Sequence, residues 1–207
     1  MSSLLVVFTR YPEPGIAKTR LIPALGAHRA AALHRRMTEH TMLRAVPPDS
    51  SLEVRYAGGS KREMRAWLGT DIPLCPQGEG NLGDRIARAF AGGFDAGYDC
   101  VAVIGADCPD LDADIVRRAF KALVENDLVL GPATDGGYYL IALSADAWGR
   151  VGGSLFQDID WGNASVLDQS LEVAKASGLA VFLIETLRDV DRPEDLPVWE
   201  RWKGKGD

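Results

Sequence analysis

The chain has 207 residues, 46% of them hydrophobic and 25% charged, which is typical of a globular domain with one sizeable core. Its formal net charge of −6 excludes the broad basic face of a general nucleic-acid-binding protein, although a local anion site is compatible with it. No apolar run approaches the ~20 residues of a membrane span, and the start lacks a secretory-signal pattern, so we expect a cytoplasmic protein.

Strand-like and helix-like patterns alternate along the chain almost to its end. Strands are predicted, in chain order, at residues 4–8, 52–56, 72–75, 101–104, 128–130, 138–143 and 181–184. Helices are predicted at residues 28–45, 82–96, 111–124 and 193–202, with two more opening at residues 60 and 165. This alternation predicts parallel strands with crossover helices on both faces, in a single α/β domain over residues 1–207. The last five residues, 203–207, are expected to fray.

Two helix starts carry the sequence pattern of a capping box, in which a short polar side chain and an acid three residues later satisfy free backbone N–H groups. The first is SKRE at residues 60–63, and the second is SVLD at residues 165–168. Both predict an N-terminal cap by the leading serine.

The cysteines and histidines predict neither a disulfide framework nor a metal site. The cysteines are odd in number and form no Cys-x-x-Cys pair. The histidines lie six residues apart on one predicted helix, so they point in three directions and cannot share one ion: His28, His34 and His40.

The loop after the first predicted strand carries three cations, Arg10, Lys18 and Arg20, against one anion, Glu13. In an α/β sheet this loop lies at the carboxyl edge, where such sheets bind their ligands. Two prolines and Gly15 bend and stiffen it, and it contains no Walker A motif. A rigid cationic loop at that edge favours a phosphate site, the alternative being a solvated turn whose cations pair with nearby acids.

A literal Gly-x-Gly-x-x-Gly occurs at Gly78, Gly80 and Gly83. It follows the third predicted strand rather than the first, which excludes the dinucleotide-binding motif. The loop at Gly80, Asn81, Leu82 and Gly83 is nevertheless a candidate to contact a nucleotide base or sugar. The alternative is a plain helix start with Asn81 as its N-cap.

Asp107 is the strongest candidate metal ligand, because it directly follows the buried strand at residues 101–104. A carboxylate at that edge can hold Mg²⁺ or Mn²⁺ against a diphosphate. Asp110, three residues later, is predicted to cap the next helix instead.

The sequence Asp135-Gly136-Gly137 joins two predicted strands. Its glycines allow a close backbone approach to a ligand, and Asp135 is a candidate to bind a sugar hydroxyl or the acceptor. A hairpin turn is the rival interpretation, and the two are compatible. Trp161 is a candidate wall of the acceptor pocket, with ordinary packing as its alternative.

Two acids, Asp189 and Asp191, follow the last predicted strand. Asp191 could cap the closing helix, with Pro193 in its first turn and Glu194 reaching back to the cap. It could equally meet Asp107 across the site as a second metal ligand, with Asp189 slightly behind it in that role.

Five motifs in this order and spacing resemble the radical-SAM/selenodomain-associated transferase family of the nucleotide-diphospho-sugar transferase (GT-A) superfamily. They are YPEPGIAKTRL (residues 11–21), GNLGDR (80–85), GADCPDL (105–111), DGGYYL (135–140) and DVDRPEDL (189–196). The resemblance runs from residue 4 to about residue 196. It implies a three-layer α/β/α sandwich with a mixed, mostly parallel central sheet, the nucleotide in the N-terminal half and the acceptor in the other.

The resemblance also implies roles for the residues singled out above. The first loop would bind the donor's phosphates through Arg10, Gly15, Lys18, Thr19 and Arg20. Asp107 would hold Mg²⁺ or Mn²⁺, with Asp191 as its second ligand. The expected partners are a nucleotide sugar or a nucleoside triphosphate together with a small acceptor.

Two reactions fit such a site, and glycosyl transfer from a nucleotide sugar is the favoured one. There the metal, Lys18 and Arg20 would stabilise the departing diphosphate, while Asp135 is the candidate base that activates the acceptor hydroxyl. The form Asp107-Cys108-Pro109-Asp110 is instead similar to guanylyltransferases of the molybdenum-cofactor and phospholactate type, which makes nucleotidyl transfer to a phosphorylated acceptor the alternative. A nucleotide-binding module without turnover is a third hypothesis.

Overall fold

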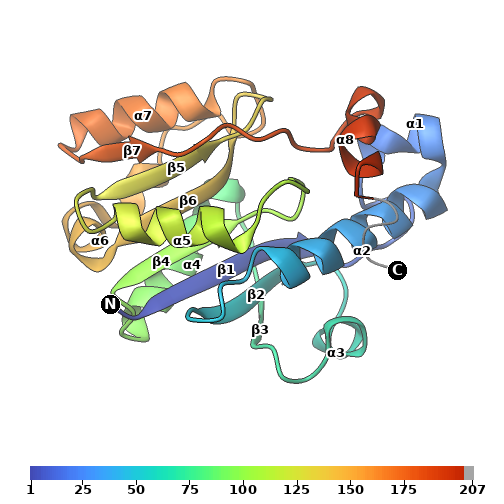
Figure 1. The fold of residues 1–207 in the computed structure, drawn as a ribbon, viewed down its shortest axis with the longest axis horizontal. Coiled ribbons are helices and arrows are strands. Elements are labelled where there is room, and N and C mark those ends of the chain that lie inside the picture. Colours follow the sequence, from blue (N-terminus) through green and yellow to red (C-terminus); the bar gives the residue numbers. More distant parts are fainter. Residues whose placement is uncertain (203–207) are drawn as a thin grey trace.

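The computed structural model describes residues 1–202, and its central feature is a seven-stranded sheet between two layers of helices (Figure 1). The strands are β1 (Ser3–Arg10), β2 (Ser51–Ala57), β3 (Leu74–Pro76), β4 (Cys100–Ile104), β5 (Leu128–Pro132), β6 (Tyr138–Ser144) and β7 (Val181–Leu183). They lie in the order β3-β2-β1-β4-β6-β5-β7, and β6 runs antiparallel to both of its neighbours while the other pairings are parallel. The mixed, mostly parallel sheet confirms the predicted fold class, whereas the prediction for residues 203–207 falls outside the described chain.

The helices surround this sheet much as the alternation predicts. They are α1 (Ile22–Leu25), α2 (Ala27–Arg44), α3 (Lys61–Leu68), α4 (Leu82–Asp95), α5 (Ala113–Ala122), α6 (Ala145–Val151), α7 (Val166–Ala176) and α8 (Leu196–Glu200), with 3₁₀ turns η1 (Thr19–Leu21), η2 (Gly152–Phe156) and η3 (Pro193–Asp195). The structure adds η1, α1, α6 and η2, which the sequence did not predict. Within residues 1–202, none of the helices has both the length and the apolarity needed to cross a bilayer.

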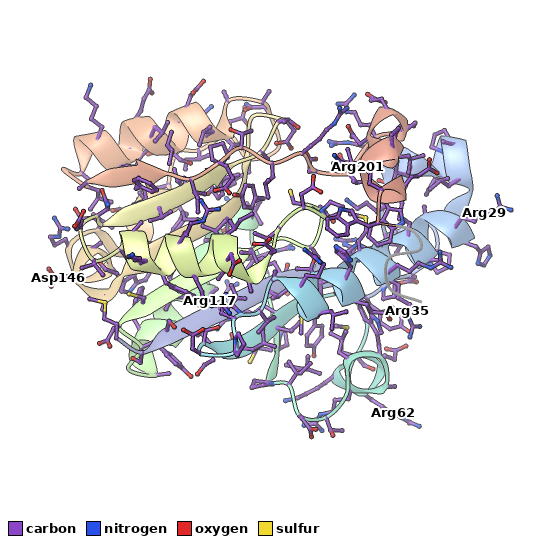
Figure 2. The ribbon with its side chains drawn as sticks, viewed as in Figure 1. Arg29, Arg35, Arg62, Arg117, Asp146 and Arg201 are labelled. Carbon is purple, nitrogen blue, oxygen red and sulfur yellow. The ribbon has the colours of Figure 1, made fainter. Side chains whose placement is uncertain are left out.

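Successive side chains of the central strands point into two separate cores. On β1, Leu5 and Val7 pack in the core under α3 and α5, whereas Leu4 and Val6 pack in the core under α4, α6 and α7. Every residue of β4 is at most 4% exposed, as predicted for a strand covered on both faces. Charged side chains such as Arg62 extend outward at the periphery (Figure 2).

A smaller apolar cluster joins the helices after β1 to the C-terminal segment beside the sheet. Leu21 and Met37 pack there with Val190, Val198 and Trp199. As a result α8 lies close to α1 and α2, at the end of the molecule toward which β1 and β4 run (Figure 1). The loop after β1 and the segment after β7 are thereby held at one edge of the sheet.

Two of the predicted helix caps are confirmed. The side chain of Ser60 accepts a hydrogen bond from the backbone of Glu63, whose carboxylate accepts one from the backbone of Ser60. Asn81 and Asp84 exchange the same pair of bonds at the start of α4. The plain helix-start interpretation of the glycine loop is therefore correct for Asn81.

Two other predicted caps are wrong. The side chain of Ser165 caps no backbone group of α7 and instead contacts Asn163 and Gln169. Asp112, rather than Asp110, caps α5 by accepting from two backbone N–H groups. The carboxylate of Asp110 is taken by the C-terminal segment, where it accepts from Arg201 at 2.8 Å and from the Trp202 indole at 2.9 Å.

Replacing Ser60 with alanine is expected to lower the free energy of unfolding by about 1 kcal/mol, because one N-terminal backbone donor of α3 loses its acceptor. The matched control is Ser177→Ala, an exposed serine just after α7 whose side chain makes none of the described hydrogen bonds. Denaturant unfolding measures both. Equal losses for the two variants would contradict the assignment of the cap.

Candidate active site

A cavity of about 680 Å³ lies at the edge of the sheet where β4 and β5 end and β6 begins. Four segments line most of it: residues 105–108 after β4, residues 133–139 of the β5–β6 hairpin, residues 161–166, and residues 188–195 after β7. Arg20 and Leu82 complete the wall from the first loop and from the start of α4. Most of the motifs singled out in the sequence therefore meet at one place.

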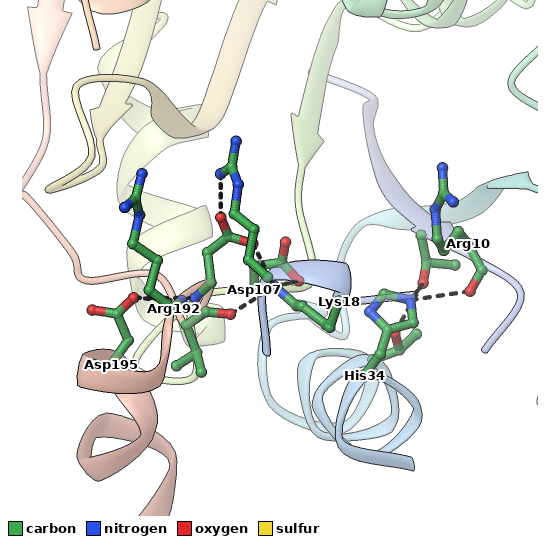
Figure 3. A network of polar contacts seen from close by, with 11 residues as sticks. Arg10, Lys18, His34, Asp107, Arg192 and Asp195 are labelled. Carbon is green, nitrogen blue, oxygen red and sulfur yellow. Dashed lines mark hydrogen bonds and ion pairs between the residues drawn. The ribbon is translucent and has the colours of Figure 1, made fainter. Parts of the chain in front are cut away.

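Lys18 joins the first loop to both candidate metal ligands (Figure 3). Its Nζ lies 2.9 Å from Oδ1 of Asp107 and 3.9 Å from Oδ1 of Asp191, and it donates to the carbonyl of Val190 at 2.6 Å. Its side chain is only 4% exposed, and its backbone has the left-handed conformation with φ 51°. A lysine backbone in that region is strained, so the surrounding contacts must hold it there.

Arg20 forms the second cation–carboxylate pair of the site, with Asp191. Unlike Lys18, its guanidinium is largely exposed and lines the cavity. Among the described residues, Arg20 is the member of the first loop that lines the cavity directly. A ligand entering the cavity can therefore reach Arg20 without any rearrangement.

Arg10 lies apart from this cluster, although the sequence placed it with Lys18 and Arg20. Its guanidinium is within 3.4 Å of the carbonyl of Ile16 in the same loop, while its own carbonyl contacts His34 Nε2 at 3.0 Å. His34 is buried, which lowers its pKa, and it also contacts the hydroxyl of Thr9. The histidine supports the end of β1 and is not on the cavity wall.

Two loop residues assigned to phosphate binding, Gly15 and Thr19, are exposed, and neither belongs to the described lining of the cavity. Gly15 has φ +87° in the turn that leads from β1 to Lys18. Thr19 follows Lys18 and begins η1.

Asp107 and the segment after β7 are tied by their backbones as well as by Lys18, because the N–H of Val190 donates to the Asp107 carbonyl at 2.8 Å. Partial burial opposes ionisation of Asp107, but the charge of the Lys18 ammonium and its hydrogen bond to the carboxylate outweigh it and lower the pKa of the carboxyl. Asp107 therefore stays ionised at neutral pH.

Asp191 does not cap η3: the carboxylate of Asp195 accepts from the backbone N–H groups of Asp191 and Arg192 instead.

The prediction that Pro193 lies in the first turn of the closing helix and that Glu194 reaches back to the cap is half correct. Pro193 does begin the terminal turn, at the first position of η3, but Asp195 rather than Glu194 reaches back to the backbone. Asp195 also accepts a bidentate pair of bonds from Arg188.

The donor set fits a divalent cation only in part. Two carboxylates, those of Asp107 and Asp191, converge on one position, which the ammonium of Lys18 occupies. Carboxylate oxygens suit Mg²⁺ and Mn²⁺, but no group of three or more metal-binding side chains occurs among residues 1–202. A Mg²⁺ ion here would take its other ligands from water and from the phosphates of a substrate, as is common for this ion.

The cavity wall carries more negative than positive charge. Three arginines line it (Arg20, Arg188 and Arg192) against six carboxylates (Asp107, Asp135, Asp189, Asp191, Glu194 and Asp195). Two of the arginines are already paired with acids of the same wall. A nucleotide diphosphate entering this cavity would need an accompanying cation to offset the repulsion.

Asp189 shows the effect of this excess of negative charge on its pKa. Burial, and then the charge of Asp135, raise the pKa of Asp189 to about 6. Asp135 accepts a hydrogen bond from the backbone of Gly137 at 2.9 Å within the hairpin turn. The hairpin interpretation of this motif is confirmed, and the turn also faces the cavity through Asp135 and Gly137.

Trp161 lines the cavity and also packs against Tyr138, whereas its role as a wall of the acceptor pocket stays a prediction. Its ring is edge-on to Tyr138, with centroids 6.3 Å apart.

The glycine loop at residues 80–83 is divided between two places. Leu82 lines this cavity, whereas Gly80 and Gly83 lie in a separate open hollow beside α4.

Sequence reasoning missed several residues of the wall. Tyr138 and Tyr139 directly follow the Asp-Gly-Gly turn, and an aromatic pair after such a turn was the available signal. Arg188 and Arg192 flank the two acids after β7, and their density of charge was visible in the sequence. Which arginines would pair within the wall was not visible, because the partners depend on the fold.

Solved structures resemble this chain over nearly its whole length. A protein of Desulfovibrio desulfuricans G20, provisionally described as a nucleotide-diphospho-sugar transferase, shares 34% identity at a TM-score of 0.91, covering 100% of this chain and 90% of that one. The 4-diphosphocytidyl-2C-methyl-D-erythritol synthase of Anaerococcus prevotii DSM 20548 shares 9% identity at a TM-score of 0.63, with 99% and 96% covered. A CMP:2-keto-3-deoxy-manno-octonic acid synthetase in complex with CTP shares 13% at 0.59, with 99% of both chains covered. None of the curated proteins matches the chain.

These likenesses and the fold define the class of the protein as the nucleotide-diphospho-sugar transferase superfamily, as the motif series implied. Within it, the chain belongs to the family described as "Uncharacterized protein conserved in bacteria (DUF2064)", whose model matches residues 42–163. Membership of the narrower radical-SAM-associated group stays a prediction.

Proposed function

We propose that the protein is a metal-dependent transferase that uses a nucleotide-activated donor, and that it moves a sugar from a nucleotide sugar to a small acceptor. The observation that carries the proposal is the convergence of Arg20, Asp107 and Asp191 on the wall of a cavity large enough for a nucleotide sugar, with Lys18 buried against the two carboxylates. The similarity to the Desulfovibrio desulfuricans protein supports the donor class.

In this proposal Arg20, already exposed to the cavity, binds the donor's phosphates and balances charge that develops on the leaving diphosphate. Lys18 supplies a second positive charge next to Asp107. Asp107 and Asp191 would hold Mg²⁺ or Mn²⁺, which would add Lewis-acid stabilisation of the same diphosphate. Asp135, on the hairpin wall, is positioned to accept a proton from an acceptor hydroxyl.

Nucleotidyl transfer is the second candidate, supported by the likeness of the fold to nucleotidyltransferases, one of them in complex with CTP. It needs a phosphorylated acceptor. The acids Asp135 and Asp189 face the cavity with the pKa of Asp189 raised to about 6, and a second phosphate beside them would be repelled. This charge arrangement favours an uncharged acceptor and hence sugar transfer.

A thermal-shift screen of nucleoside triphosphates and nucleotide sugars, with and without Mg²⁺, tests the proposal. We expect nucleotide sugars to raise the melting temperature only in the presence of the metal. Stabilisation by triphosphates alone would favour nucleotidyl transfer, and no stabilisation by either class would contradict a nucleotide site.

Arg20→Met is expected to weaken binding of the nucleotide diphosphate about tenfold, since one charge-assisted contact to phosphate is lost. Stability should change little, because the Arg20–Asp191 pair is largely exposed. Arg117→Met is the matched control: that arginine is also an exposed, acid-paired side chain, but it lies on α5 away from the cavity. Calorimetry measures the affinity of each variant for the nucleotide diphosphate, and equal affinities of the two variants would contradict the role of Arg20.

A further inference from the structure

The segment at residues 157–165 spans the cavity between the start of α4 and the β5–β6 hairpin. Trp161 and three following residues line the cavity, and Ala164 lies against the hairpin at Gly136. Directly after the segment, the backbone of Leu167 donates to the Gly136 carbonyl at 2.9 Å. The segment is thus held on the hairpin side by backbone contacts.

On the other side the segment rests on Gly83, the second residue of α4. Gly83 is buried, and a Cβ built on it would lie 2.6 Å from Nε1 and 2.8 Å from two ring carbons of Trp161. Such distances are far below van der Waals contact, so any side chain at position 83 would displace the indole. Because Gly83 has no side chain, the indole of Trp161 can lie directly against the start of α4.

Packing, rather than hydrogen bonding, holds the indole in this place. Its Nε1 is buried without a hydrogen-bond partner among the described residues. A buried donor left unpaired is unfavourable, so the contacts with Gly83 and Tyr138 must outweigh it. An unfavourable position that is maintained at a cavity wall indicates a functional constraint.

The surroundings of Trp161 indicate which part of a ligand it would meet. Leu82, Tyr138 and Trp161 form an aromatic and aliphatic wall, and Asp135 lies on the same hairpin as Tyr138. A carboxylate accepts hydrogen bonds but donates none when ionised, so it pairs with hydroxyl groups and repels phosphates. An apolar wall beside acceptor oxygens suits an uncharged, hydroxylated group.

From this geometry we infer that Trp161 is the residue that selects for the sugar of a nucleotide sugar over a bare nucleoside diphosphate, and that Gly83 is the positioning residue that sets its place. The inference rests on the proposed function, since it assumes a nucleotide donor. The diphosphate itself is bound elsewhere on the wall, by Arg20 and by the divalent cation that Asp107 and Asp191 would hold.

Calorimetry with four probes, UDP, GDP, UDP-glucose and GDP-mannose, each with Mg²⁺, tests the inference. In the parent protein we expect one nucleotide sugar to bind at least about tenfold tighter than its own diphosphate. Gly83→Ala and Trp161→Ala should abolish that difference and change affinity for the diphosphate less than twofold, whereas Trp161→Phe should retain it. Gly149→Ala, at an exposed position of α6 with no atom within 4 Å of the added methyl group, is the control and should behave as the parent.

Retention of the sugar preference in Gly83→Ala would overturn the inference, and so would an equal fall in affinity for sugar and diphosphate. If the parent bound none of the four probes, the proposed function would be wrong. Hydrogen exchange then decides the positioning role by itself: we expect at least tenfold faster exchange over residues 157–165 in Gly83→Ala than in Gly149→Ala. Equal exchange in the two variants would contradict it.

Discussion

Replacing Asp107 with asparagine is expected to abolish the effect of Mg²⁺ on nucleotide binding and to lower the free energy of unfolding by about 3 kcal/mol. The second effect arises because the Lys18 ammonium is only 4% exposed and would lose its nearest counter-charge, 2.9 Å away. This expected loss of stability lies at the lower end of the range for breaking a buried ion pair, because Asp191 and the Val190 carbonyl remain close to Nζ of Lys18. Denaturant unfolding and calorimetry with and without Mg²⁺ measure the two effects.

Lys18→Met provides the matched comparison, because it breaks the same pair from the other side. The Asp107 side chain is 47% exposed, so water can hydrate its carboxylate once the ammonium is gone. We therefore expect a smaller loss of stability than for Asp107→Asn, together with weaker nucleotide binding even without metal. In the double variant Lys18→Met/Asp107→Asn no buried charge is left unpaired, and its stability should exceed that of Asp107→Asn alone. Strictly additive losses would contradict a direct interaction between the two side chains.

The fold was largely predictable because its signals are local. The continuous apolar run of β4 is typical of a buried central strand, and the SKRE sequence specifies the capping box of α3 without help from distant residues. Helix α6 escaped prediction because it has only seven residues, includes Gly149, and runs directly into another glycine-containing turn, η2.

The cap of α5 shows what local patterns lack. Asp110 and Asp112 are both suitable caps by sequence, and they lie two residues apart. The choice is made by Arg201 and Trp202, about ninety residues away, which take the carboxylate of Asp110. The sequence around Asp110 does not reveal a partner so far along the chain.

The candidate site likewise has features that the sequence predicted and features that depend on residues far apart in the chain. Strand-end reasoning predicted that Asp107 would lie at the same edge of the sheet as the first loop, and it left Asp191 equally a helix cap or a second metal ligand. That Lys18 would lie between the two carboxylates was not predictable, since it depends on the left-handed backbone at Lys18 and on the Val190 carbonyl. The contact of Trp161 with Gly83 likewise depends on the path of the chain between α6 and α7.

Gly136→Ala is expected to lower the free energy of unfolding by about 3 kcal/mol, and it tests the attachment of the segment at residues 157–165 to the hairpin. Gly136 has φ +90°, a conformation that is unfavourable for alanine by about 1 kcal/mol. In addition, its Cβ would lie 2.0 Å from the carbonyl oxygen of Ala164, so the backbone must move to admit it, which adds about 2 kcal/mol.

Gly162→Ala separates these two contributions, because it lies in the same segment with φ +103° but has open space around the added methyl group. We expect this variant to lose only the backbone part, about 1 kcal/mol. The difference between the two variants, measured by denaturant unfolding, then reports the contact between Gly136 and Ala164. Equal losses would mean that the segment yields freely at Ala164, whereas a larger loss in Gly136→Ala means that the hairpin and the segment hold each other in place over the cavity.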